Sequence, residues 1–211
     1  MWTFEGYHYG MSGKHPTKEA LIATVVTLLD NHPLESITSE QVLEISKISR
    51  GSMYHHFEDF SDLIEEAQVR RYAAYVDQSI VLLSSIVHDV TSRDEMVKQV
   101  RFVTTVTQSD GVKENRFERL VALAKGVRSP RMQAILGVEQ ERLTEMIADL
   151  YREVLKKGWG NPSLDPRSIA VLIQAYSLGK VVDDVTDTHM DGEKWDHLIN
   201  TILETVLFPA Q

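Results

Sequence analysis

The sequence has no cysteine, no long apolar run, and no basic N-terminal segment followed by an apolar stretch. The lack of cysteine excludes disulfides, thiolate nucleophiles and cysteine-ligated zinc, and it favours a reducing compartment. A membrane-spanning helix needs roughly 18 consecutive apolar residues, and no segment approaches that length. Residues 1–13 lack the pattern of an export signal. We therefore expect a cytoplasmic protein with no membrane segment.

What is present is the composition of a folded globular protein. The chain has 211 residues, of which 43% are hydrophobic and 25% charged, enough for two modest domains with their own cores. Its formal net charge of -9 argues against binding of nucleic acid over the whole surface, because phosphate binding depends largely on cationic groups. A local DNA-binding face remains open.

Helical periodicity runs through most of the sequence, without convincing strand alternation. A first helix is predicted to start near Pro16 or Thr17 and to stop before Pro33. A long helix predicted from Ser61 to Val87 connects the N-terminal module to the rest. Five further helices are predicted in the ranges 93–108, 115–127, 130–157, 166–185 and 193–207. Together with two short helices between Thr38 and Phe57, they predict an all-α fold of about nine helices, preceded by a flexible arm at 1–13.

Residues 38–57 have the pattern of two short helices joined by a tight turn. Thr38 is an N-cap with Gln41 three residues later, a capping box that satisfies backbone N–H groups at a helix start. Ser49 caps the second helix. The pattern predicts a helix-turn-helix whose core holds Val42, Ile48, Met53 and Phe57. The second helix can lie in the major groove of DNA, with outward side chains from Arg50, Ser52, Tyr54 and His55.

This segment resembles the tetracycline-repressor (TetR) family of bacterial transcriptional regulators. The matching residues are Ile37 and Thr38, the run Ile48–Tyr54, and His55–Phe57 leading to Leu63. The resemblance implies a three-helix DNA-binding head at 14–60 and a helical-bundle body at 61–211 for ligand binding and dimerisation. It also implies a homodimeric repressor that a small-molecule effector releases from a palindromic double-stranded DNA operator. The implied DNA-binding residues are Thr38, Ser39, Lys47, Ser49, Arg50, Gly51, Ser52, Tyr54, His55 and His56.

Two departures from the family pattern fall in the same segment. Lys47 stands where members usually have glycine in the turn, so strain or an altered turn is expected there. The lysine that usually follows the last phenylalanine of the motif is replaced by the run Glu58–Phe60. Between residues 14 and 59, four lysines and arginines face seven aspartates and glutamates. DNA affinity is therefore expected to depend on few cations.

The last two predicted helices carry the strongest packing signals. Apolar residues in the range 193–207 recur at i, i+3, i+4 and i+7, which makes one wide apolar stripe, and the range 166–185 is apolar nearly all round. Burial alone explains both patterns, and the family resemblance adds a dimer interface. The residues expected at this interface are Ile173, Val181, Trp195, Leu198, Ile199, Ile202, Leu203 and Val206.

The resemblance also implies a ligand pocket among the helices between Arg93 and Val182, from which an effector would tilt the long fourth helix and change the separation of the two heads. Arg101, Arg119 and Gln174 are polar candidates if they point inward, and are otherwise solvated. The methionine and aromatic content favours an apolar or aromatic effector. The apolar candidates, each of which also fits an ordinary core position, are Phe102, Val106, Phe117, Leu120, Met132, Ile135, Met146, Leu172 and Tyr176.

Two other functions stay open. A helical small-molecule or partner-binding protein could have kept the body and lost effective DNA binding, as the acidic head permits. A helical enzyme has less support, because the sequence contains no catalytic nucleophile arrangement, metal-ligand set or cofactor motif. We therefore expect no catalytic residue, no metal and no cofactor. The range 187–192 faintly resembles a calcium loop, but its twelfth position is Leu198 instead of a glutamate.

Overall fold

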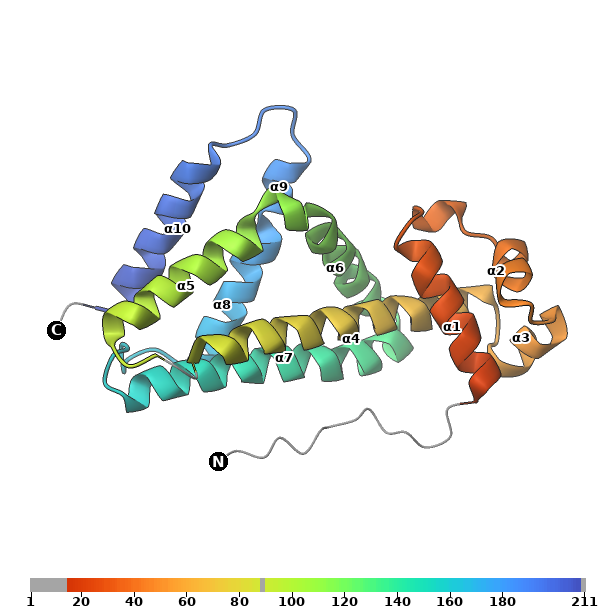
Figure 1. The fold of residues 1–211 in the computed structure, drawn as a ribbon, viewed down its shortest axis with the longest axis horizontal. Helices are drawn as coiled ribbons and strands as arrows, with labels where there is room; N and C mark the ends of the chain where they lie inside the picture. The colour runs from red at the N-terminus through yellow and green to blue at the C-terminus, as the bar shows by residue number, and fades with distance from the viewer. Residues whose placement is uncertain (1–14, 88–89, 210–211) are drawn as a thin grey trace. The chain divides into compact units, whose positions relative to one another are not determined.

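The computed structural model describes residues 15–87 and 90–209, and every regular element in these ranges is helical. The arm expected at 1–13 lies outside the described residues. Two short 3-10 helices are present, η1 (Leu34–Ser36) and η2 (Asp110–Val112). The α-helices, shown in Figure 1, are α1 (Pro16–Leu29), α2 (Ser39–Ser46), α3 (Arg50–His56), α4 (Phe60–Val87), α5 (Arg93–Gln108), α6 (Lys113–Gly126), α7 (Pro130–Lys156), α8 (Pro166–Gly179), α9 (Val181–Asp184) and α10 (Gly192–Leu207).

The all-α prediction is confirmed. Within the described ranges, nine of the helices have at least 7 residues, and α9 is a turn of 4 residues. No helix in this part of the chain is both long and apolar enough to cross a bilayer. The predicted helix at 93–108 has the bounds of α5, and the other predicted bounds differ from the observed ones by few residues.

Helix starts follow the capping residues that the sequence offers. Ser129 and Asp165 each accept a hydrogen bond from a backbone N–H of the first turn, and proline takes the first helical position, where no N–H is needed. One predicted helix differs, because the range 166–185 is interrupted at Lys180, between α8 and α9. The buried Lys180 ammonium donates to the Gln108 carbonyl oxygen at 2.6 Å, so its side chain is held against the end of α5.

The described residues form two compact units that divide at Arg71 and Tyr72, within α4. The first unit contains α1, α2, α3 and the start of α4. Leu63, Ile64 and Ala67 of α4 are buried in its core, which explains why the unit continues past residue 60. The predicted helix-turn-helix core is present, with Ile48 packed against the buried side chains of Val42, Met53 and Phe57.

The second unit contains the remainder of α4 and the helices α5 to α10. In it α7 packs against α8, α5 against α10, and α6 against both α7 and α8. One part of its core gathers Tyr151, Ile169 and Leu203 from α7, α8 and α10. The Tyr151 hydroxyl is satisfied inside this core, because it contacts the backbone of Asn161 and the carbonyl oxygen of Leu207. Several of these helices line the cavity described below.

Candidate DNA interface and effector cavity

The turn between α2 and α3 is closed by one residue in the left-handed conformation. Lys47 has φ 58° and ψ 24°, a region that residues other than glycine adopt at a cost. The turn therefore needs the conformation that glycine provides most easily, although lysine occupies the position. The predicted capping box is also formed, since Gln41 N donates to Thr38 Oγ1 at 3.3 Å and Thr38 N donates to Gln41 Oε1 at 2.9 Å.

The residues of α3 differ in burial and polarity. Met53 is fully buried, and Phe57, directly after the helix, is nearly so. Arg50 and Tyr54 are exposed, and 49% of Tyr54 is accessible to solvent. Ser49 begins the helix by accepting a hydrogen bond from Ser52 N at 3.1 Å. All ten residues predicted to bind DNA lie on α2, the turn or α3 or next to them, and each is exposed or half-buried.

The cation at the start of α3 has a partner in the same unit. Arg50 Nη2 lies 2.6 Å from Glu40 Oε1, and both side chains are largely exposed. Hydrogen bonds from the Glu40 backbone, from Ser39 and from Arg50 lower the pKa of Glu40, so its carboxylate is ionised at neutral pH. A DNA phosphate or base that binds Arg50 must compete with this carboxylate.

Three histidines gather beside the first helix and the end of α3. The ring centres of His15 and His56 lie 4.3 Å apart, and those of His55 and His56 lie 5.1 Å apart. Burial lowers the pKa of His56, and the positive charges of His15, His55 and Lys18 lower it further. The neutral imidazole of His56 is therefore favoured at neutral pH, and acidification adds positive charge at this end of α3.

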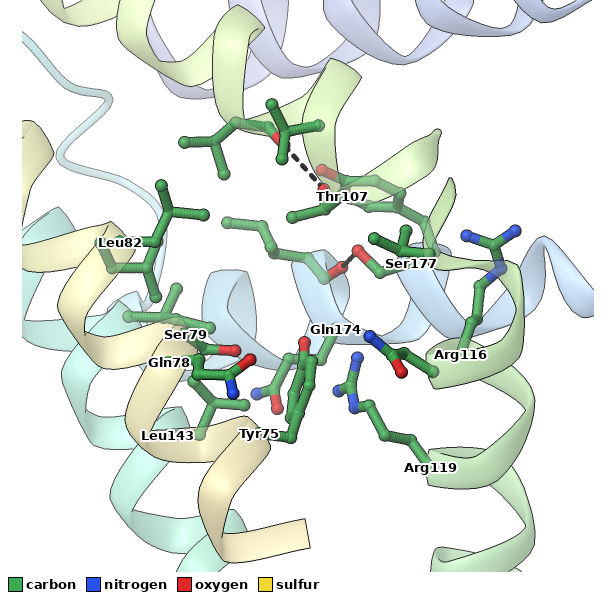
Figure 2. Close-up of a pocket in the computed structure, with 18 residues that line it drawn as sticks. Tyr75, Gln78, Ser79, Leu82, Thr107, Arg116, Arg119, Leu143, Gln174 and Ser177 are labelled. Carbon is green, nitrogen blue, oxygen red and sulfur yellow. Dashed lines mark hydrogen bonds between the residues drawn. The ribbon is translucent and has the colours of Figure 1, made fainter. Parts of the chain in front are cut away.

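The second unit contains a cavity of about 220 Å³. Its wall includes Tyr75, Gln78, Ser79 and Leu82 from α4, which face the space between the helices in Figure 2. Leu83 of α4 also lines the cavity. The other side chains of the wall come from the α5–α6 region, α7 and α8, and they are Val103, Val106, Thr107, Val112, Asn115, Arg116, Arg119, Leu143, Ile147, Ile173, Gln174, Tyr176 and Ser177. A smaller, almost wholly apolar cavity of about 100 Å³ adjoins it and shares Leu83, Val103, Ile147, Ile173 and Tyr176.

The polar candidates lie in three different settings. Gln174 lines the cavity, but its amide oxygen accepts from Gln140 Nε2 at 2.6 Å, and its amide nitrogen donates to Thr144 Oγ1 at 3.1 Å and to a backbone carbonyl. Its hydrogen bonds are therefore used within the protein. Arg101 lies outside both cavities and pairs with Glu204 on the surface. Arg119 lines the main cavity and is buried.

No protein-family model and no curated protein matches the sequence. Solved structures match nearly the whole chain. A TetR-family transcriptional regulator from Mesorhizobium loti is 13% identical with a TM-score of 0.65, and the match covers 90% of this chain and 94% of that one. A TetR-family transcriptional regulator from Rhodococcus sp. is 19% identical with a TM-score of 0.59, and this match covers 91% of this chain and 99% of that one. The chain has the TetR-family fold.

A third matching structure holds a small molecule. It is a transcriptional regulator from Saccharomonospora viridis in complex with choline, 14% identical to this chain with a TM-score of 0.65. The match covers 90% of this chain and 97% of that one. At this identity the comparison establishes the shared TetR fold, whereas the ligand belongs to that protein alone.

The apolar ligand candidates divide when they are placed on this TetR fold. Val106 and Tyr176 line the main cavity, and Tyr176 lines the smaller one as well. The other seven line neither cavity: Met132 is buried elsewhere, Ile135 and Met146 are half-buried, and Phe102, Phe117, Leu120 and Leu172 are exposed. The helical pattern of α4 predicts a connector between the two units and does not by itself predict a cavity wall. The signal was available, since Tyr75, Gln78, Ser79 and Leu82 are spaced i, i+3, i+4 and i+7.

The residues expected at a dimer interface lie on both sides of the last helices. Leu198 and Ile202 of α10 are 50% and 43% exposed. Ile199 and Leu203 are buried in the core of the unit, Ile173 lines the cavities, and Val181, Trp195 and Val206 are half-buried. Part of the apolar stripe of α10 therefore packs inward. An outward apolar surface remains, and it also includes Val171, Leu172 and Val182 from α8 and α9.

Proposed function

We propose that this protein is a cytoplasmic transcription regulator that binds double-stranded DNA through α3 and leaves it when a small molecule occupies the cavity of the second unit. The burial and exposure of the residues of α3 are the main support for this proposal. Met53 and Phe57 are buried in the core of the first unit, whereas Arg50 and Tyr54 are exposed to the surroundings. A helix held in this way can enter a major groove with its backbone and outward side chains close to the base edges.

The outward residues suit different parts of a duplex. The planar guanidinium of Arg50 can donate two hydrogen bonds to a guanine edge or to a phosphate. The hydroxyl groups of Thr38 and Tyr54 are exposed donors for phosphate oxygens. Gly51 keeps the first turn of α3 narrow, because it has no side chain beyond the backbone. The remaining predicted contacts, Ser39, Lys47, Ser49, Ser52, His55 and His56, surround these residues.

A second copy of the chain would complete the DNA-binding protein. The helices α8, α9 and α10 expose apolar side chains to water, which is energetically unfavourable, and these are Leu198, Ile202, Leu172 and Val182. Burial of this surface against the same surface of another chain forms a two-fold dimer. Two α3 helices would then bind two half-sites of a palindrome. Of the residues expected in this interface, Leu198 and Ile202 are the ones with the most exposed surface to contribute.

The helix α4 offers a physical route from effector to DNA. Its first half supplies Leu63 and Ala67 to the core of the DNA-binding unit. Its second half supplies Tyr75 and Leu82 to the cavity wall. An effector that displaces the second half of a continuous helix changes the position of the first half. An effector therefore shifts the protein between two states if it binds one of them better.

Fluorescence anisotropy with labelled duplexes from the region upstream of the gene tests the DNA-binding part of this proposal. We expect Arg50→Ala to weaken binding by at least about tenfold, the loss of one charged groove contact. Arg70→Ala is the matched control, because Arg70 belongs to the same unit and pairs with Glu19 of α1, outside α2 and α3. Equal DNA affinity of wild-type protein and Arg50→Ala would remove α3 from the interface.

One observation favours a second candidate function. The Arg50–Glu40 ion pair and the acidic composition of residues 14–59 both oppose contact with phosphate. A protein that binds a small molecule or a protein partner through its body, without effective DNA binding, fits that observation. Failure to bind any duplex at about 50 mM salt, together with ligand binding in the cavity, would favour this second function.

A further inference from the structure

The cavity wall carries charge of only one sign. Among its 18 residues there is no aspartate or glutamate, but there are two arginines, Arg116 and Arg119, both from α6. The remaining side chains are apolar, hydroxyl-bearing or amide-bearing. A ligand that enters the cavity therefore meets positive charge without a compensating acidic group in the wall.

Arg116 is neutralised by the protein itself. Its Nε and Nη2 atoms lie 3.0 Å and 2.9 Å from Asp184 Oδ2, and both side chains are buried. Asp184 belongs to α9 and does not line the cavity. This pair leaves no net charge on the Arg116 side of the cavity. The positive charge of the wall is therefore that of Arg119.

Arg119 has no acidic partner of this kind. Its side chain is buried, with 8% of the residue exposed, and its Nε atom makes no hydrogen bond. Its guanidinium carbon lies 3.9 Å from the centre of the Tyr75 ring, and Figure 2 shows the two groups together in the cavity. Within residues 15–87 and 90–209, no carboxylate forms an ion pair with Arg119. The buried carboxylate of Glu139 on α7 instead lies 3.2 Å from Arg142 Nη1.

The nearby phenol does not supply the missing negative charge. Burial raises the pKa of Tyr72, and the positive charge of Arg119 only partly opposes this rise. The Tyr72 hydroxyl therefore stays protonated at neutral pH, and it donates its hydrogen bond to Gln140 Oε1. The neighbours of the Arg119 guanidinium therefore include the Tyr75 ring face and the neutral Tyr72 hydroxyl. An arginine cannot lose its proton at any physiological pH, so its charge remains.

A buried cation without an ion-pair partner favours an anionic ligand. A guanidinium fits a carboxylate with two parallel hydrogen bonds, and the pair is strongest where water is excluded. Away from Arg119, the wall becomes apolar at Leu83, Val103, Ile147 and Ile173, and these residues continue into the smaller cavity. The site therefore has a cationic end and an apolar end.

We propose that the effector of this protein is a monocarboxylate with an apolar body, whose carboxylate binds Arg119 and whose body lies along the shared apolar wall. The role of this ligand as an effector rests on the proposed function, but ligand binding at this site does not depend on DNA. It replaces the purely apolar or aromatic effector expected from composition with an amphipathic anion. It also excludes a cation such as choline, because Arg119 would repel it.

Calorimetry and thermal unfolding of the full chain with a matched set of probes test the proposal without DNA. The probes are octanoate, decanoate and phenylacetate, with octan-1-ol as the neutral match and octylamine as the cationic match. We expect at least one carboxylate to bind and to raise Tm, octan-1-ol to bind at least tenfold more weakly than octanoate, and octylamine not to bind. Wild-type protein that binds none of the carboxylates, or that prefers the amine, overturns the proposal.

Two substitutions locate the carboxylate. Arg119→Gln and Arg119→Met should lower carboxylate affinity at least tenfold and leave octan-1-ol binding within about twofold. Arg119→Met should also raise the Tm of the ligand-free protein, because it removes a buried charge that has no acidic partner. Arg101→Gln is the matched control, since Arg101 is exposed and lines neither cavity. Unchanged carboxylate affinity in both Arg119 variants would overturn the assignment.

The same carboxylate, added to a protein–duplex complex, separates this inference from the proposed function. Binding that depends on Arg119 and releases DNA supports both. Binding that depends on Arg119 in a protein that holds no duplex supports the carboxylate site and contradicts the regulator function. Release of DNA by the neutral or cationic probe, without any effect of the carboxylates, supports the regulator and contradicts the carboxylate site.

Discussion

Removal of the negative charge of Glu40 should strengthen DNA binding. In the free protein Arg50 Nη2 lies 2.6 Å from Glu40 Oε1, and binding to DNA must break or share this contact. An exposed ion pair changes an equilibrium constant by at most about fivefold, because solvent screens it. Glu40 also stands beside the surface proposed for phosphate, and the loss of one like charge there adds a further small factor. Together these effects predict a duplex affinity about five- to tenfold higher for Glu40→Gln at about 50 mM salt.

Fluorescence anisotropy at several salt concentrations measures this effect, with Glu44→Gln as the control. Glu44 lies one turn further along α2 and is exposed, so its substitution removes the same charge without releasing Arg50. We expect a gain of about twofold or less for Glu44→Gln, and a gain for Glu40→Gln that disappears near 0.5 M salt. The reasoning is refuted if Glu40→Gln binds no more tightly than Glu44→Gln, or if it binds less tightly than wild type.

Three further predictions concern stability, measured by urea unfolding. The pKa of His56 in the folded protein lies below its ordinary value of 6.5, so as the pH falls the unfolded chain binds a proton at this residue before the folded protein does. The free energy of unfolding should therefore decrease below about pH 6.5 and should not be affected by His56 above it. His56→Gln should flatten this pH dependence. Lys47→Gly should stabilise by about 0.5–1 kcal/mol, because it relieves the left-handed conformation at the cost of some chain entropy, and a loss would contradict the strain argued for this turn. Gly126→Ala should destabilise by about 1 kcal/mol, since its Cβ would lie 2.9 Å from a buried side chain, whereas Gly137→Ala, with nothing within 4 Å, should stabilise by about 0.5–1 kcal/mol; equal effects of the two would refute the packing argument.

The helices and the DNA-binding surface are local properties, and they could be predicted from the sequence. Capping residues such as Thr38 and Ser49 act on the backbone within three residues, so their effect can be inferred without knowledge of the fold. The conformation of Lys47 could not be predicted from the sequence alone. The sequence identified an unusual residue in the turn, but only the structure shows that the left-handed conformation is retained there.

The cavity depends on contacts between distant helices, and most of its wall could not be predicted. Arg101 and Arg119 look alike in the sequence, yet Arg101 pairs with Glu204, more than 100 positions away, and Arg119 is buried against Tyr75. Similarly, Phe102 and Val106 lie one turn apart on α5, but only Val106 reaches the cavity. Side-chain direction on a helix decides burial only after its neighbours are placed.

The most direct test of the account is a selection of duplexes from a random DNA pool with the purified wild-type protein, followed by sequencing. If α3 recognises DNA, we expect enrichment of an inverted repeat whose half-sites are spaced by about one or two turns of DNA, and loss of this enrichment with Arg50→Ala. A wild-type protein that enriches no sequence, or that enriches the same sequence after Arg50→Ala, would contradict the claim that α3 recognises DNA.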